Sequence, residues 1–594
     1  YRCLQAGYRH LLCDNTYIYH KGTQSFSQEK TELINSHLQI LKSRYPSCIE
    51  NTESFVQKNP ISDIQLNIRY AINSHSKKNV LIVIHDFKEA EKKNIGGTTL
   101  HVHDLIKNMK EEFNFHVLYY SDDDFKYHVT SFLPFDKITS TLGTYLQYTT
   151  LNLYNDTFNR DIKILIDTLK IDLIHIHHLK HMYLDIFKAA KERSIPVIYT
   201  LHDFYSICPS VKLFNKETFL CNYANAAGCG SCIAKTFNLN INFIPLWRKE
   251  FYENLKTVKK IIVPSYSTKN IFLNTYKDLT IEVVEHGYDK INGKPNNDNP
   301  DKKKNKKFNI AFIGYITEEK GLKYLEELIE KVKGTDINVH LFGQTTNKKY
   351  NKNKTNYAYH GKYIQQDLPN LLLENDIKLI CLLSMWPETY SYTLSESLIS
   401  EIPVISFDLG AIAERVKRAD VGWILPINST LDDIFKLIST IKSAPQEYKQ
   451  KVERIRHLLK NMKSLKDMGN EYTEIYNKTI NAFPIENHDI YYTQSRNEFY
   501  RKGKEIPTLD LKEEKKEYKR LKVQFLSNKL LMKCEIFATP IPTVNAETRS
   551  FSNLYGTEFY ELTSREILQN DFSSSGSNTS NIIYSRKIQS PPYI

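Results

Sequence analysis

Residues 384–396 read SMWPETYSYTLSE, and the rest of the chain is best interpreted outward from this stretch. The apolar run at 377–383 predicts a buried strand before it, and the apolar spacing of 394–399 predicts a helix after it. Glu388 would lie in the turn and Glu396 in the first turns of the helix. Carboxylates beside the N–H groups of a helix start suit a sugar nucleotide, because they accept hydrogen bonds from hydroxyls while the N–H groups hold phosphate oxygens. Two solvated acids at a helix start would look the same, so both interpretations stay open.

Composition and charge are those of a soluble globular protein with several domains. The 594 residues are too many for one hydrophobic core, and the apolar content of 41% and charged content of 25% are ordinary. No apolar run approaches the length of a membrane-spanning helix. Much of the net charge of +12 lies in a lysine run at residues 302–307, which is typical of a solvated linker. Because no nucleic-acid-binding motif is visible, we expect no nucleic-acid partner.

The two ends of the chain differ from its centre. Residues 1–4, YRCL, show neither an initiator Met nor the pattern of a signal peptide, so we expect the sequence to be part of a longer chain. Residues 483–594 hold a charged helical piece at 511–531 and then Ser/Asn/Thr-rich sequence. We expect an irregular C-terminal extension, to which the sequence assigns no function.

Short apolar strands alternate with amphipathic helices from residue 79 onward, which predicts an α/β protein whose parallel sheets are covered on both faces. One unit spans 76–288 and a second spans 308–482, and a polar linker at 289–307 joins them. The predicted strands of the first unit are 80–85, 116–120, 173–177, 197–201, 261–264 and 281–285. Those of the second unit are 308–313, 338–342, 357–360, 377–383, 403–407 and 422–425.

Candidate ligand-binding residues follow several of these strands, where parallel sheets place functional groups. Gly96 and Gly97 precede a predicted helix, and paired glycines there let backbone N–H groups approach an anion. Gly314 ends the first strand of the second unit, and Lys320 adds a positive charge at the next helix start, which suits a diphosphate. His202 follows the strand that ends at Leu201 and suits proton transfer or contact with a developing charge. A flexible turn, a surface lysine and a helix-capping histidine are the alternatives.

The nine cysteines have irregular spacing, which does not predict a disulfide framework and favours a reducing cytoplasm. Four of them, Cys208, Cys221, Cys229 and Cys232, lie in one Gly/Asn-rich loop region. Four thiolates would close a tetrahedral structural zinc site with no open position. Since twelve residues separate the first pair, four reduced thiols without a metal are the alternative.

With two linked α/β units and these turns, residues 79 to about 480 resemble the family 4 glycosyltransferases. The resemblance lies in Glu388 and Glu396, which seven residues separate, with support from residues 314–321, the Gly96-Gly97 turn and His202-Asp203. It implies the GT-B fold, in which two Rossmann-like units face each other across a cleft. It also implies that a terminal helix returns from the second unit to the first. The nearest likeness is to bacterial enzymes of surface polysaccharide synthesis.

Residues 1–75 resemble the C-terminal end of a family 2 glycosyltransferase domain, and such domains precede the family 4 domain in some of those bacterial enzymes. In family 2 a His in the place of His20 helps to hold the donor's divalent metal. A surface His before a Gly turn is the alternative. The Asp-rich motif that such a domain needs would lie upstream of residue 1, so we expect a remnant that cannot act alone.

The resemblance implies a retaining sugar transfer from a nucleotide donor, with no metal cofactor required for catalysis. Glu396 would bind the ribose, Glu388 the donor-sugar hydroxyls, and His202 would contact the donor near the reacting carbon. Stabilisation of the leaving diphosphate would fall to Lys320 and the N–H groups around Gly97, Tyr392, Thr393 and Leu394. Family members often carry a basic residue where this chain has Tyr315, which leaves Lys320 with fewer helpers.

We therefore expect an enzyme that binds a nucleotide-sugar donor and a glycan or lipid-linked glycan acceptor in the cytoplasm, with peripheral membrane association as an option. The acceptor would dock on the first unit, whose loops, especially 125–159, reveal no specificity. A binding module that serves as a scaffold for a family 2 domain is the main alternative. A GT-B sugar-nucleotide epimerase would need carboxylates placed otherwise. The sequence does not indicate the oligomeric state.

Overall fold

The computed structural model describes residues 6, 30–58, 77–88, 96–133, 136–143, 153–215, 221, 226–237, 240, 242–289 and 307–483, and four short strands near the C-terminus. Those strands are β15 (Cys534–Glu535), β16 (Ser550–Ser552), β17 (Glu558–Tyr560) and β18 (Ser585–Arg586). Contacts divide the chain into a unit of residues 1–76 with 496–505 and a unit that holds the rest. The predicted His20 site, most of the 289–307 linker and the 511–531 helix lie outside the described residues.

The described part of the smaller unit consists mainly of two helices, α2 (Lys30–Arg44) and α3 (Pro46–Lys58). Several of their large apolar side chains are exposed, among them Leu38, Ile40 and Val56. These helices carry none of the candidate catalytic residues, so the functional site is built in the other unit.

Besides the short pairs β15-β18 and β16-β17, the larger unit contains two large sheets, and the first has the strand order β4-β3-β2-β1-β5-β6-β7-β8. Its strands are β1 (Lys78–Val83), β2 (Phe113–Ser121), β3 (Lys126–Leu133), β4 (Asp136–Gly143), β5 (Ile171–Ile176), β6 (Val197–Thr200), β7 (Lys260–Val263) and β8 (Ile281–Val283). All pairings are parallel except those of β3 with β2 and β4. We call this sheet and its helices the N-terminal domain.

The second sheet is parallel throughout and has the Rossmann order β11-β10-β9-β12-β13-β14. Its strands are β9 (Phe308–Ile316), β10 (Ile337–Thr345), β11 (Tyr357–Gly361), β12 (Ile377–Leu382), β13 (Val404–Phe407) and β14 (Gly422–Leu425). The strand order reverses between β9 and β12, which is where a ligand crevice opens in such sheets. We call this sheet and its helices the C-terminal domain.

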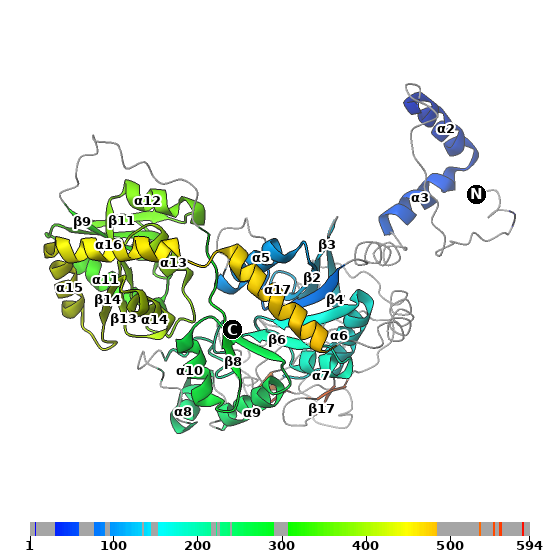
Figure 1. The fold of residues 1–594 in the computed structure, drawn as a ribbon. Coiled ribbons are helices and arrows are strands. Elements are labelled where there is room, and N and C mark those ends of the chain that lie inside the picture. Colours follow the sequence, from blue (N-terminus) through cyan, green and yellow to red (C-terminus); the bar gives the residue numbers. More distant parts are fainter. Residues whose placement is uncertain are drawn as a thin grey trace. The chain divides into compact units, whose positions relative to one another are not determined.

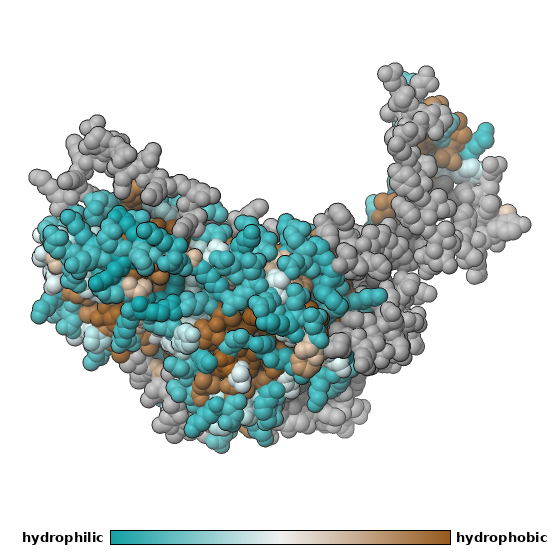
Figure 2. Space-filling view, in the orientation of Figure 1, coloured by the Kyte–Doolittle hydropathy of each residue, from teal (hydrophilic) through white to brown (hydrophobic). Residues whose placement is uncertain are grey.

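Helices cover both sheets, as the alternating sequence pattern predicts. Those of the N-terminal domain are α5 (Gly97–Met109), α6 (Asp156–Leu169), α7 (Asp185–Glu192), α8 (Ala226–Phe237), α9 (Phe243–Leu255) and α10 (Tyr266–Thr275). Those of the C-terminal domain are α11 (Leu322–Lys331), α12 (Leu368–Glu374), α13 (Tyr392–Ile399), α14 (Gly410–Ala419), α15 (Leu431–Ser443) and α16 (Pro445–Lys460), with short 3-10 turns at 318–320, 348–350 and 365–367. The outer face around α16 is largely hydrophilic (Figure 2). No described helix is long and apolar enough to cross a membrane.

The last described helix, α17 (Leu465–Ala482), returns to the N-terminal domain, as the resemblance implies. It lies beside α5, and its residues Met468, Tyr472 and Tyr476 are buried in the core of the first sheet (Figure 1). A Ser464 side chain accepts a hydrogen bond from the N–H of Asp467 in a capping box that fixes where the helix begins. Burial of three large side chains ties the end of the C-terminal domain to the N-terminal domain.

All twelve predicted strands are confirmed, with boundaries shifted by at most a few residues. The sequence prediction missed the hairpin β3–β4, which occupies part of the 125–159 region that we expected to be loops. β4 alternates between buried and more exposed residues, with Ile138 buried, whereas β3 mixes buried and half-buried residues, Val129 among the buried ones. Polar and charged residues fill the alternate positions, so the segment lacks the continuous apolar run that marked the parallel strands.

Candidate active site

The turn after β12 holds a buried carboxylate close to an ammonium group. Glu388 is 7% exposed, and its Oε1 accepts a hydrogen bond from Ser384 Oγ at 2.6 Å. Lys320 reaches the same oxygen from the turn after β9, with Nζ 3.9 Å away, and its side chain is 35% exposed. The structure therefore brings Glu388 and Lys320 together where the strand order reverses, which is the position predicted for a diphosphate and a sugar.

Glu396 lies further along the chain, inside α13, and it is also buried, with an exposed fraction of 7%. One oxygen accepts a hydrogen bond from Gln365 Nε2 at 2.8 Å and the other from Tyr363 OH at 3.1 Å. Gln365 also contacts Tyr288 OH of the N-terminal domain at 2.8 Å. Burial raises the pKa of Glu396, against the hydrogen bonds and the charge of Lys320, which lower it. Glu396 is thus an acceptor for hydroxyl groups at the border of the two domains.

The start of α13 has an unusual backbone. Its N-cap Ser391 has φ 74° and ψ 97°, a conformation that a residue with a Cβ seldom adopts, and Ser391 Oγ accepts from the N–H of Leu394 at 3.4 Å. The side chains of Tyr392 and Thr393 project from the first turn of the helix. Backbone strain of this kind is retained where the surroundings hold it, and it often marks a ligand site.

Two of the predicted glycines lie against this helix start. A Cβ on Gly97 would lie 3.2 Å from Cδ2 of Tyr392, and one on Gly314 would lie 3.4 Å from Cγ2 of Thr393. Gly97 is the first residue of α5, and Gly314 lies in β9 with φ +98°, so one element of each domain approaches the start of α13. Gly96 is the N-cap of α5, with open space where a Cβ would stand. The structure brings these predicted residues together, and their ligand contacts remain predictions.

Arg415 of α14 supports the same turn and was not identified from the sequence. Its Nη1 donates to the backbone oxygens of Tyr390 and Ser391 at 3.0 Å each, and its Nη2 donates to Ser395 Oγ at 2.8 Å. Its guanidinium also lies 4.1 Å from the centre of the Tyr390 ring. Nothing in the local sequence marks Arg415, because its partners lie 20 to 25 positions earlier in the chain.

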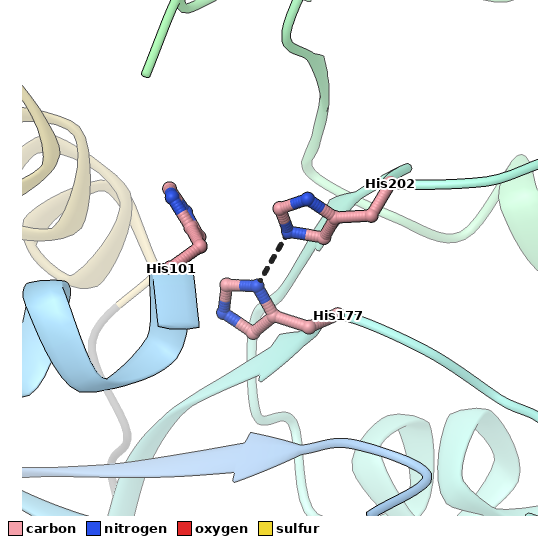
Figure 3. A group of neighbouring side chains, drawn as sticks. All are labelled: His101, His177 and His202. Atoms are coloured by element: carbon pink, nitrogen blue, oxygen red, sulfur yellow. Dashed lines mark hydrogen bonds between the residues drawn. The ribbon is translucent and has the colours of Figure 1, made fainter. Parts of the chain in front are cut away.

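His202 lies within a group of buried histidines in the N-terminal domain (Figure 3). Its Nε2 is 2.9 Å from Nδ1 of His177, and burial lowers its pKa to about 3, so the ring is neutral at pH 7. The sequence placed His177 near a strand end without assigning it a role. His101 of α5 and His286 after β8 complete the neighbourhood, with their Nδ1 atoms 2.5 Å apart, and the sequence singled out neither.

Contacts between the two domains converge on the backbone near His202. Thr389 Oγ1 donates to the backbone oxygen of His202 at 2.7 Å, and Tyr390 OH donates to that of His286 at 3.0 Å. Glu414 accepts hydrogen bonds from the first N–H groups of α10 at 3.2 and 2.6 Å. These contacts place the turn that carries Glu388 directly over the strand ends of the N-terminal domain.

A cavity of about 560 Å³ remains beside these contacts, bordered by both domains. From the N-terminal domain it is lined by α10, including Ser267 and Asn270, and from the C-terminal domain by Pro387 and by Gly410 at the start of α14. Its wall thus begins one residue from Glu388.

The structure does not assemble the four cysteines into a metal-ligand set among the described residues, although Cys221 and Cys229 lie near enough to Cys208 to raise its pKa, so the zinc site stays a prediction. Cys208 Sγ lies 3.2 Å from Ser210 Oγ, Cys229 Sγ accepts from Arg248 at 3.6 Å, and Cys232 Sγ lies 3.8 Å from Thr236 Oγ1. Within the ranges that the structure describes, the metal-capable group of side chains is a set of histidines and includes no cysteine.

Two Rossmann-like domains with polar turns at the facing ends of their strands make the GT-B architecture. Comparison with known families agrees: residues 95–290 match the model described as Glycosyltransferase Family 4, and residues 293–458 match Glycosyl transferases group 1. The two matches together span both domains. They identify this part of the chain as a glycosyltransferase, and the protein is an enzyme that depends on a nucleotide-sugar donor.

Individual relatives are more distant. A Klebsiella pneumoniae protein named "Uncharacterized 41.2 kDa protein in cps region" is 25% identical over 314 residues, which cover 52% of this chain and 79% of that protein. Among solved structures, Anabaena HepE in complex with UDP is 12% identical with a TM-score of 0.45, over 68% of this chain and 100% of that one. A Rickettsia africae glycosyltransferase is 17% identical with a TM-score of 0.47, over 68% and 99%. The assignment rests on the two family models.

Proposed function

We propose that this glycosyltransferase moves a sugar, with retention of configuration, from its donor to a glycan or lipid-linked glycan in surface polysaccharide synthesis. The match to a protein from a Klebsiella cps region supports the polysaccharide role. The observation that carries the proposal is the pairing of Glu388 and Lys320 beside the start of α13. The reaction would proceed on the cytoplasmic face, with the acceptor entering from the N-terminal domain.

The donor would lie across the strand ends of the C-terminal domain. Glu388, already oriented by Ser384, would accept hydrogen bonds from sugar hydroxyls, and Glu396 would accept them from the ribose. The diphosphate would meet the N–H groups at the start of α13 and the ammonium of Lys320, which stabilise charge as the leaving group departs. Because the groups that face the phosphates are backbone amides and one lysine, we propose that catalysis needs no metal.

His202 would contact the donor from the opposite domain. Its imidazole is neutral, so it can donate one hydrogen bond without placing a second positive charge beside Lys320. The direct hydrogen bond from Thr389 to the His202 backbone holds the two sides of the site together. Closure of the domains in this way excludes water and limits donor hydrolysis.

A thermal-shift panel of UDP-, GDP-, ADP- and dTDP-sugars tests donor binding first, since a bound ligand raises the unfolding temperature by mass action. Donor hydrolysis by the full chain, with and without EDTA, is then compared with that of a Lys320→Ala, Glu388→Ala double variant. A Lys323→Ala, Glu327→Ala double variant is the matched control, because that surface pair on α11 has the same 3.9 Å separation. We expect loss of hydrolysis only in the first variant and no effect of EDTA.

A scaffold module that binds nucleotide sugars without turnover is the alternative, and it would show a thermal shift but no hydrolysis and no transfer to any glycan acceptor. We also propose that residues 1–75 are the remnant of a family 2 domain. A longer chain with a complete family 2 domain would then carry a second, metal-dependent transfer activity. Loss of both activities in the Lys320→Ala, Glu388→Ala variant of that longer chain would contradict the two-domain proposal.

A further inference from the structure

Three histidine side chains from separate elements converge inside the N-terminal domain. His101 comes from α5, His177 from the end of β5 and His202 from the end of β6, and each offers a ring nitrogen within 4.8 Å of the other two (Figure 3). Their exposed fractions are 1%, 0% and 8%. Three side chains from distant points of the sequence are thus held at close range by the parallel sheet and its first helix.

The hydrogen bonds of this group are incomplete. His177 Nδ1 and His202 Nε2 lie 2.9 Å apart, yet Nε2 of His101 and Nε2 of His177 have no hydrogen-bond partner among the described residues. A buried polar atom without a partner costs roughly 1–3 kcal/mol, and native proteins contain few of them. Two such atoms in one small group indicate that a bound species satisfies the group in the folded protein.

We propose that His101, His177 and His202 bind a divalent transition-metal ion of the zinc class. Neutral imidazole is a preferred ligand of such ions, with metal–nitrogen distances of about 2.0–2.1 Å, and three histidines with one exchangeable position form a known type of zinc site. The ring nitrogens need to move by only about an ångström to reach that geometry. The fourth position would hold water or an anion.

The surroundings suit such an ion in two respects. His286 engages the Nδ1 of His101 at 2.5 Å, so the ligand ring is oriented by a second hydrogen bond, as ligating histidines usually are. All three rings are buried, so solvent water has little access to an ion bound between them. The ion would use the nitrogen of His202 that faces His177 and leave its other nitrogen for the donor, so the transfer step does not pass through the metal.

The test uses Zn²⁺ and Co²⁺ with the full chain after chelator treatment and dialysis. Metal content is measured by mass spectrometry, and Co²⁺ binding is followed by visible absorption, which reports four-coordinate geometry. His101→Asn and His177→Asn are the test variants. The control is His340→Asn, since His340 and His360 form another close pair, 2.9 Å apart, in the C-terminal domain. A Cys208→Ser variant separates this site from the cysteine loop.

We expect one equivalent of zinc in the wild type, the His340→Asn variant and the Cys208→Ser variant, and at least a hundredfold weaker binding in the two test variants. The Co²⁺ spectrum should be intense and lack a thiolate charge-transfer band. Absence of metal uptake by the wild type, or equal uptake by the His101→Asn and His177→Asn variants, would overturn the proposal and leave buried water as the occupant. A thiolate band that disappears in the Cys208→Ser variant would also overturn it and assign the metal to the cysteines.

Discussion

Replacement of Arg415 by Met should weaken both the fold and nucleotide binding, although Arg415 lies behind the site rather than in it. The guanidinium donates to the backbone oxygens of Tyr390 and Ser391 and to Ser395 Oγ, over 2.8–3.0 Å. Met keeps most of the apolar volume but offers no donor, so two backbone oxygens at the start of α13 lose their partner. The strained Ser391 conformation then loses the contacts that hold it.

The size of the effect follows from these contacts. A hydrogen bond from a charged group contributes about 1.5–3 kcal/mol, and because Arg415 is half-buried and the bonds are not additive, we expect a total loss of unfolding free energy of about 2–4 kcal/mol. A positive φ at a residue such as Ser391 costs roughly 1–3 kcal/mol. If the turn relaxes in the variant, the nucleotide must restore that strain on binding, which lowers affinity about 5- to 150-fold.

Urea unfolding and calorimetric titration with the nucleoside diphosphate chosen by the thermal-shift panel measure the two quantities. Lys417→Met is the matched control: its partner is Asp408 at 2.5 Å, both side chains are about half exposed, and surface pairs contribute about 0–1 kcal/mol. Wild-type affinity in a folded but destabilised Arg415→Met protein would refute the argument that the guanidinium preorganises the turn. Unchanged stability would refute the hydrogen-bond assignment itself.

Three further substitutions test ionisable side chains. Glu396→Gln should bind the donor at least tenfold more weakly at pH 8, because a carboxylate is the better hydrogen-bond acceptor. The affinity of the wild type should fall on acidification, since burial raises the pKa of Glu396, and the affinity of the variant should not. Burial raises the pKa of Asp185 from 3.8 to about 7, so between about pH 4 and pH 7 the unfolded chain releases this proton and the folded protein keeps it. The wild type therefore loses unfolding free energy as the pH rises through this range, and Asp185→Asn should gain stability relative to it. Burial lowers the pKa of His116 to about 3, so between pH 6.5 and about 3 only the unfolded chain takes up a proton at this side chain. Through His116 the wild type therefore loses up to about 1.4 kcal/mol of unfolding free energy for each pH unit of acidification, and His116→Asn should remove that loss.

Matched controls exist for each of these. Glu401→Gln removes a carboxylate paired with Arg456 outside the site and should leave donor affinity unchanged. Asp432→Asn, whose side chain is 79% exposed, and His457→Asn, on the exposed side of α16, should follow the wild-type stability curve across pH. If a test variant and its control showed the same change in pH dependence, overall net charge rather than the buried group would be its cause.

The sequence was sufficient for the architecture because parallel strands that are buried on both faces are continuous apolar runs. Runs such as 80–84 and 310–313 are buried throughout, and the twelve predicted strands include these runs together with shorter, partly exposed strands such as β8 and β11. The hairpin β3–β4 escaped because its strands lie at the sheet edge and alternate in polarity. Its pairing is antiparallel and depends on β2, a neighbour that the local pattern does not reveal.

The candidate site was predictable to the extent that its residues stand in turns after strands. Glu388, Lys320 and the start of α13 could be placed at one sheet edge because the carboxyl ends of parallel strands share an edge. Arg415 and His101 could not be found in this way, since each acts from a helix interior and reaches the site only through packing. The zinc prediction for the cysteines relied on sequence proximity, which does not fix how four side chains of a long loop lie in space, so it stays a prediction.

The contacts between the domains indicate that donor binding should depend more on the turn after β12 than on the histidine side chains that face it. Thr389 and Tyr390 donate to backbone oxygens of His202 and His286, so the N-terminal domain presents main-chain acceptors that no substitution at those histidines removes. The donors, by contrast, are side chains, and they lie in the same turn as Glu388. One short segment therefore holds the domains together and carries the proposed sugar contact. Any change in that segment should alter donor affinity and domain closure together, which ties exclusion of water to occupancy of the site.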